Sequence, residues 1–138
     1  MDTWNITYPA ELEEEIMLFK EHAPPGLKAK PLTIVLTGHG LRSEDGNLCA
    51  GISSPKRKAI YLDTTSTHWI ESKTSLTWHE LGHYVLDRRH DERFFIHPLF
   101  PEITIPESVM TIEPEPTDQL LDEKPFLQEY YLNELFSR

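Results

Sequence analysis

His79-Glu80-Leu81-Gly82-His83 is an H-E-x-x-H motif, whose residue types and spacing could activate a water molecule. Residues four apart on an α-helix lie on one face about a turn apart, so both imidazoles could bind one metal ion. Glu80 projects from nearly the same side and could act as a general base. Zinc makes a bound water acidic enough to attack a peptide carbonyl near neutral pH. The motif therefore predicts a zinc-dependent hydrolase, most simply a peptidase.

The residues around the motif favour a metal site over a chance match. Ser75 to Trp78 lead into it and Tyr84 to Leu86 follow it, so the expected helix is strongly apolar. A largely buried helix does not direct two His and a Glu inward without a partner, because buried polar groups need one. The alternative is a soluble α+β domain without a metal, in which both His are polar surface residues.

His90 is the candidate for a third ligand, because a catalytic zinc usually takes three protein ligands and leaves one position for water. On one unbroken helix His90 would lie about three turns beyond His79, too far to bind the same ion. The helix must therefore end near Leu86 and the chain must fold back. Asp87 tolerates left-handed backbone, and the basic residues after it suit a helix C-terminus. Alternatively, His90 is a surface residue in the charged run 87–93.

Together with Ser108-Val109-Met110-Thr111, these residues resemble the metzincin zinc endopeptidases, whose pattern is H-E-x-x-H-x-x-G-x-x-H followed by a Met-containing turn. The resemblance implies three zinc ligands, a general base and a Met-turn residue beneath the metal: His79, His83 and His90, Glu80, and Met110. Two departures are visible, since Leu86 replaces the family Gly and His90 lies one residue later than usual. The extra residue could make the turn without a glycine of positive φ.

This longer spacing is similar to that of small, uncharacterised bacterial metalloproteases. Their pattern runs from a Gly-x-Cys segment through H-E-L-G-H and a late His-Asp to a Ser-x-Met and a Tyr-x-x-Glu-Leu-Phe tail. The corresponding segments here are Gly46 to Cys49, His90-Asp91, Ser108 to Met110, and Tyr131 to Phe136. The resemblance covers roughly the last two-thirds of the chain.

Leu48 to Ser53 and Ala59 to Asp63, joined by a basic connection, predict a β-hairpin. In metzincin-like folds the first of these strands lies at the sheet edge above the active-site helix and receives the substrate as an added strand. The resemblance thus implies a substrate-binding role for Leu48, Cys49, Ala50 and Gly51. The alternative is an ordinary edge strand covered by loops.

The remaining elements predict one α+β domain over residues 1–138, and the resemblance implies that it is zincin-like. It would contain a small twisted mixed β-sheet packed on an N-terminal helix and the H-E-x-x-H helix, with a C-terminal helix. Pro9 to His22 has the pattern of the first helix, and Leu32 to Thr37 that of a central strand. Leu120 to Phe136 predicts the closing helix, broken or started at Pro125. Phe94 to Pro101 is expected to be irregular and to pack beneath or beside the cleft. The resemblance implies that it forms part of a specificity-pocket wall, and the alternative is a loop that fills a small core.

The net charge of the chain argues against two classes of binding partner. The formal charge of -10 argues against nucleic acid and anionic membrane surfaces. A peptide or protein substrate is what the motif and the metzincin resemblance imply. The N-terminus lacks the basic and apolar regions of a signal peptide, no stretch is long enough to cross a bilayer, and Cys49 is the single cysteine. We therefore expect a cytoplasmic protein, with release by lysis or non-classical secretion left open.

Three questions stay open at this point. In a gluzincin-like hydrolase a downstream carboxylate, Glu102 or Glu107, would replace His90 as a ligand. In a non-catalytic binding or assembly protein the zinc would only stabilise the fold, although a structural zinc does not need Glu80. The donor to the reaction's oxyanion could be Tyr130, Tyr131 or His97.

Overall fold

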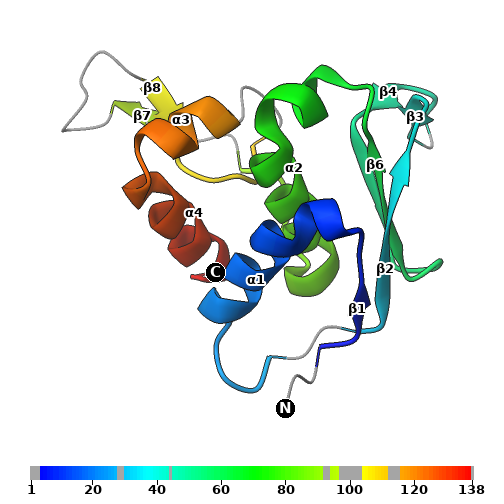
Figure 1. Ribbon diagram of the computed structural model, residues 1–138, viewed down its shortest axis with the longest axis horizontal. Coiled ribbons are helices and arrows are strands. Elements are labelled where there is room, and N and C mark those ends of the chain that lie inside the picture. Colours follow the sequence, from blue (N-terminus) through cyan, green and yellow to red (C-terminus); the bar gives the residue numbers. More distant parts are fainter. Residues whose placement is uncertain are drawn as a thin grey trace.

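The computed structural model describes residues 4–27, 30–43, 45–91, 94–96, 104–111 and 116–137, and has a mixed α+β architecture. In chain order the elements are β1 (Ile6–Thr7), η1 (Ala10–Leu12), α1 (Glu13–His22), β2 (Leu32–Thr37), β3 (Leu41–Arg42), β4 (Leu48–Cys49), β5 (Gly51–Ser54), β6 (Ala59–Asp63), α2 (Thr67–Leu86), β7 (Phe94–Ile96), β8 (Thr104–Pro106), α3 (Asp118–Glu123) and α4 (Phe126–Phe136). In Figure 1 the helices lie to one side of the main sheet.

The main sheet is mixed, in the order β1-β2-β6-β5. β1, β2 and β6 run parallel, whereas β5 and β6 form an antiparallel hairpin. Alternate residues of the central strands are buried toward the helices, which gives the sheet one apolar face: Leu32, Ile34, Ile60 and Leu62. The predicted central strand is therefore confirmed, and a hairpin is confirmed for the part formed by β5 and β6.

The strand predicted over Leu48–Ser53 is wrong as one unit. Leu48 and Cys49 form β4, which pairs with β3 in a separate two-stranded sheet. Of the predicted strand, only the part in β5 belongs to the main sheet, where it lies at one edge. Ala50 lies between the two strands, and its carbonyl accepts a hydrogen bond from the N–H of Asp63 at 2.8 Å. The chain changes sheets within one residue, which alternation of apolar residues alone does not reveal.

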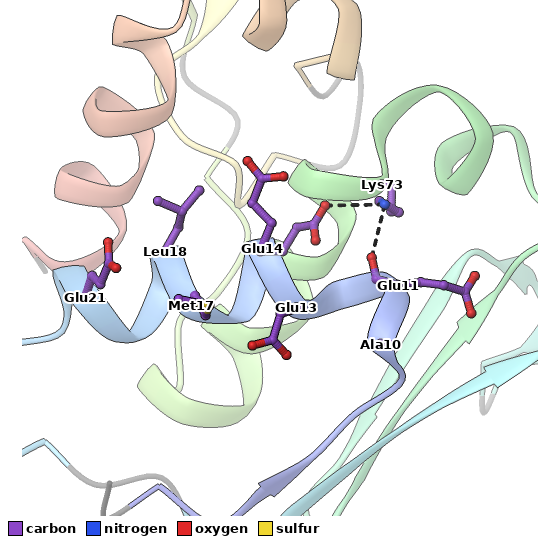
Figure 2. Close-up of a pocket in the computed structure, with 9 residues that line it drawn as sticks. Ala10, Glu11, Glu13, Glu14, Met17, Leu18, Glu21 and Lys73 are labelled. Carbon is purple, nitrogen blue, oxygen red and sulfur yellow. Dashed lines mark hydrogen bonds and ion pairs between the residues drawn. The ribbon is translucent and has the colours of Figure 1, made fainter. Parts of the chain in front are cut away.

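The N-terminal helix is confirmed, although it begins with a 3₁₀ turn, η1, before α1. Leu12, Ile16 and Phe19 share one face and are fully buried. The opposite side is acidic and forms a shallow open pocket (Figure 2), where Nζ of Lys73 donates to the Glu11 carbonyl and pairs with Glu15. The amphipathic pattern thus binds α1 to the core and leaves most of its carboxylates in water.

Helix α2 consists of two parts joined at Ser72, whose φ of -140° and ψ of 44° are not helical. The Ser66 side chain caps the first part by accepting from the N–H of Trp69. The Asp118 carboxylate caps the second part, since it accepts from the N–H groups of Lys73 and Thr74 at 3.3 and 3.1 Å. A distant residue therefore starts the helical segment that carries the motif.

The C-terminal part matches its prediction, because Pro125 separates α3 from α4. The expectation of irregular chain from residue 94 is corrected: β7 pairs with β8 as an antiparallel hairpin, and residues 97–101 lie outside the described part. Within the residues described, no helix combines the length and apolar character needed to cross a bilayer.

Candidate metal centre

His79 and His83 lie on the same face of the second part of α2, with their Nε2 atoms 3.1 Å apart. His79 is only 8% exposed, whereas His83 is partly buried. Residues between and before them, Leu76, Trp78 and Leu81, belong to the hydrophobic core. The helix therefore offers two imidazoles from a rigid, packed element, as the motif predicts.

The chain reverses direction immediately after α2, as the position of His90 requires. The helix ends at Leu86, and Asp87 adopts the left-handed conformation at φ 53°. The N–H groups of Asp87 and Arg88 both donate to the Gly82 carbonyl, which closes the turn. The left-handed residue thus comes one position after Leu86, and it is an aspartate, which tolerates this conformation better than most residues.

This turn brings His90 to the other two histidines. Nε2 of His90 lies 3.2 Å from Nε2 of His83, and one ligand atom from each of the three rings lies within 4.8 Å of the others. The predicted three-His group is confirmed as a set that could hold a metal ion. Among the described residues no carboxylate joins it; Glu107 is outside the group, and Glu102 lies in a part not described.

Hydrogen bonds on the far side of two rings determine their tautomers. Nδ1 of His79 is 2.7 Å from the Val109 carbonyl, and Nδ1 of His83 is 2.7 Å from the Arg88 carbonyl. A carbonyl only accepts, so each Nδ1 must carry the proton and each neutral ring must present a lone pair at Nε2. Two lone pairs therefore face each other across 3.1 Å, an arrangement that a cation between them would stabilise.

A proton is a poor candidate for that cation at neutral pH. Burial, with a smaller contribution from the neighbouring His83 and His90, lowers the pKa of His79 to about 3. Burial also lowers the pKa of His83. Imidazole ligands suit zinc and several other transition metals. Nitrogens bound tetrahedrally at about 2.0–2.1 Å from zinc would lie roughly 3.3 Å apart, close to the separations here. The donor set fits such an ion.

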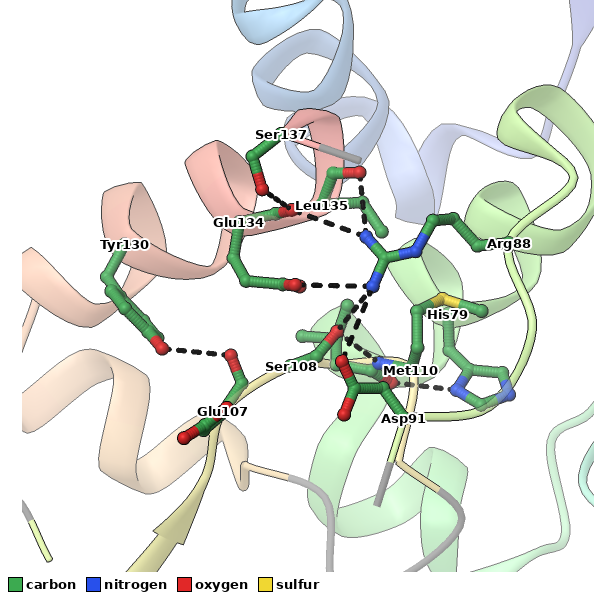
Figure 3. Close-up of polar contacts among 11 residues, drawn as sticks. His79, Arg88, Asp91, Glu107, Ser108, Met110, Tyr130, Glu134, Leu135 and Ser137 are labelled. Carbon is green, nitrogen blue, oxygen red and sulfur yellow. Dashed lines mark hydrogen bonds and ion pairs between the residues drawn. The ribbon is translucent and has the colours of Figure 1, made fainter. Parts of the chain in front are cut away.

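The segment Ser108–Met110, called the Met-turn below, lies against α2 (Figure 3). Met110 is fully buried, and a Cβ at Gly82 would come within 2.5 Å of its Sδ. Two carbonyls of the turn hold the site: that of Val109 accepts from His79, and that of Met110 accepts from the N–H of Asp91 at 3.0 Å. The sequence singled out Met110 but did not reveal these carbonyl acceptors, because any residue type supplies them.

Glu80 is 5% exposed and lies against the edge strand. A Cβ at Gly51 of β5 would stand 2.9 Å from Cγ of Glu80 and 3.0 Å from Oε1, so the absence of a side chain makes room for the carboxylate. Burial, and then the charge of Glu80, raises the pKa of Cys49. The motif's acid therefore lies between α2 and the β4–β5 segment.

An open groove of about 990 Å³ runs beside this segment. It is lined by three of the four residues predicted to bind substrate, Leu48, Cys49 and Ala50, whereas Gly51 contacts Glu80. His68 lies on the first turn of α2 and lines the groove, close enough to lower the pKa of His79. It is not one of the three grouped ligands.

The candidate oxyanion donors are engaged elsewhere or not described. The hydroxyl of Tyr131 donates to the Pro106 carbonyl at 2.8 Å, and that of Tyr130 donates to the Glu107 carbonyl at 2.9 Å. Tyr131 is also fully buried, and burial raises its pKa. His97 lies outside the described residues.

No protein family, curated protein or solved structure matches this chain.

Proposed function

We propose that this chain is a zinc metallopeptidase with a metzincin-like, zincin-type site. The observation that carries the proposal is the convergence of three Nε2 atoms, two of them held as lone-pair donors by backbone carbonyls. A site with three protein ligands and an open position is the arrangement of catalytic zinc. The neighbouring carboxylate of Glu80 supports a catalytic role, because a purely structural zinc needs no base.

Zinc in this position would supply a Lewis acid that lowers the pKa of water and polarises the carbonyl of the substrate. His79, His83 and His90 would hold it, each through Nε2. The backbone carbonyls of Val109 and Arg88 keep two of these rings in the required tautomer and orientation.

Glu80 would take the proton from the attacking water and pass it to the leaving amine. Its carboxylate is buried against Gly51, so its orientation is restricted before substrate arrives. The groove past Cys49 and His68 would hold the peptide. β5 is an edge strand of the main sheet in the described part of the chain, so an extended peptide could pair with its outer edge.

Metal content and hydrolysis of a peptide library test the proposal. Purified wild type should bind about one zinc per chain, and His90→Ala should bind it much more weakly. Glu107→Ala is the matched control for a carboxylate ligand and should retain zinc. Glu80→Gln should retain zinc and lose hydrolysis by about 10²- to 10⁴-fold, the usual contribution of a general base.

Undiminished hydrolysis by Glu80→Gln would remove the assigned base. Loss of zinc in Glu107→Ala together with its retention in His90→Ala would favour the gluzincin-like alternative. A wild type that binds zinc tightly and cleaves no peptide would favour a non-catalytic binding protein.

A further inference from the structure

The side chain of Arg88 enters the interior directly after α2, although the residue belongs to a charged run. It is 8% exposed and reaches the C-terminal end of α4 (Figure 3). Nη1 donates to the carbonyl of Leu135 at 2.9 Å and to that of Glu134 at 3.3 Å, and Nη2 pairs with the Glu134 carboxylate at 3.2 Å. The last carbonyls of a helix carry partial negative charge, so this end of α4 is a suitable site for a guanidinium.

The same guanidinium also contacts the two segments that flank the third ligand. Nη2 lies 3.4 Å from Oγ of Ser108 in the Met-turn and 3.8 Å from Oδ2 of Asp91. Oγ of Ser108 in turn accepts from the N–H of Met110 at 3.0 Å. One side chain therefore joins α4, the Met-turn and the turn that carries His90.

The backbone of Arg88 belongs to the site as well. Its N–H donates to the Gly82 carbonyl at 3.0 Å, and its carbonyl accepts from Nδ1 of His83 at 2.7 Å. His90 follows two residues later. A displacement of Arg88 would therefore move the acceptor that orients one ligand and the segment that carries another.

A buried guanidinium with five donors in a planar fork is held in one position by several acceptors, unlike a flexible ammonium. Its desolvation is offset by the Glu134 and Asp91 carboxylates and the α4 carbonyls. An apolar side chain, which needs no buried acceptors, could fill the same space if packing were the only requirement. The contacts match what is needed to hold the 87–91 turn, which lacks regular secondary structure of its own.

We propose that Arg88 is a positioning residue for the metal centre: its buried guanidinium holds the turn in which His90 meets His79 and His83. The inference rests on the proposed zinc site and goes beyond it, because it assigns the geometry of the third ligand to contacts with the C-terminal helix.

Zinc affinity, measured by competition with a chromophoric chelator, is the primary test and needs no substrate. Arg88→Met should weaken zinc binding by about 10- to 100-fold, the usual effect of removing a group that orients a ligand. Arg88→Lys should restore only part of the affinity, because one ammonium cannot span α4 and the Met-turn. Arg89→Met is the matched control: the adjacent arginine is exposed, and its loss should leave affinity unchanged.

A general loss of stability must be separated from positioning. In a His90→Ala background the third ligand is gone, so Arg88→Met should cost less zinc affinity than it costs in the wild type. The cobalt(II) absorption spectrum should also change in Arg88→Met and not in Arg89→Met. An equal loss in both backgrounds with an unchanged cobalt spectrum would overturn the inference.

If Arg88→Met does not fold, Glu134→Gln provides the second test, since it removes the charged partner from α4 without altering the turn. It should weaken zinc binding several-fold, and wild-type affinity in both Glu134→Gln and Arg88→Lys would overturn the inference. The proposed peptidase activity is tested separately: a wild type that binds zinc but cleaves no peptide would contradict that activity and would not contradict the role of Arg88.

Discussion

Gly51→Ala provides a steric test of the position of Glu80. The added Cβ would lie 2.9 Å from Cγ, 3.0 Å from Cδ and 3.0 Å from Oε1 of Glu80. The backbone of Gly51 has an ordinary φ, so the substitution adds no backbone strain. Gly51 is held by pairing with Leu62 of β6, and the adjacent Ala50 carbonyl accepts from the Asp63 N–H. We therefore expect the added Cβ to displace the side chain of Glu80 and not the backbone of β5.

The size of the displacement follows from these contacts. Cγ must retreat by about 0.5 Å to reach 3.4 Å, where ordinary van der Waals contact begins, and further to relax fully. A misplacement of about 1 Å in an active site costs on the order of 100-fold in rate. We expect kcat/KM to fall by about 10- to 100-fold, equivalent to about 1.4–2.7 kcal/mol of transition-state stabilisation.

The assay compares kcat/KM on the best peptide of a library with zinc content. Zinc should stay at the wild-type level, because the three histidines are untouched. Gly38→Ala is the matched control, since a Cβ there meets nothing within 4 Å. In a Glu80→Gln background the Gly51→Ala substitution should cost little more. Full kcat/KM in Gly51→Ala, or an equal further loss in the Glu80→Gln background, would refute the idea that Gly51 positions this carboxylate.

Two further predictions concern stability. Asp118→Ala should lower the free energy of unfolding by about 1 kcal/mol, because the N–H groups of Lys73 and Thr74 lose their cap. Asp118→Asn keeps an acceptor and should lower it less. Equal midpoints of urea unfolding for the wild type and both variants would contradict the capping role. The metal-free protein should lose stability as the pH falls below about 6.5, because the unfolded chain protonates His79 while burial holds the folded pKa at about 3. The loss between pH 6.5 and 5 should reach about 1.6 kcal/mol for His79 alone, and His83 should add to it in the same direction. The measurement is urea unfolding in EDTA across this pH range, and a free energy of unfolding that does not change with pH would contradict the prediction.

Local patterns in the sequence predicted the elements near the site. A 3.6-residue period with Leu12, Ile16 and Phe19 indicated the first helix, and a β-branched run indicated β2. These features depend on near neighbours in the chain, so they can be read without knowing what packs against them. The same holds for the end of α2: the distance from His79 to His90 required a reversal, and Asp87 makes it.

The predictions that failed depended on pairing between distant segments. Nothing in Leu48–Ser53 indicates that its first two residues pair with β3 while the rest pair with β6. The pairing of β7 with β8 was missed for the same reason. Strand partners are chosen by tertiary packing, and short segments carry little information about that choice.

For the metal centre, the sequence by itself determined the donor types, the spacing of His79 and His83, and the need for a turn before His90. Tertiary structure decided which atoms meet. Backbone carbonyls of Val109 and Arg88 select the tautomers, and a missing Cβ at Gly51 makes room for Glu80. Carbonyls and empty space carry no residue-type signal, so only the folded chain reveals them.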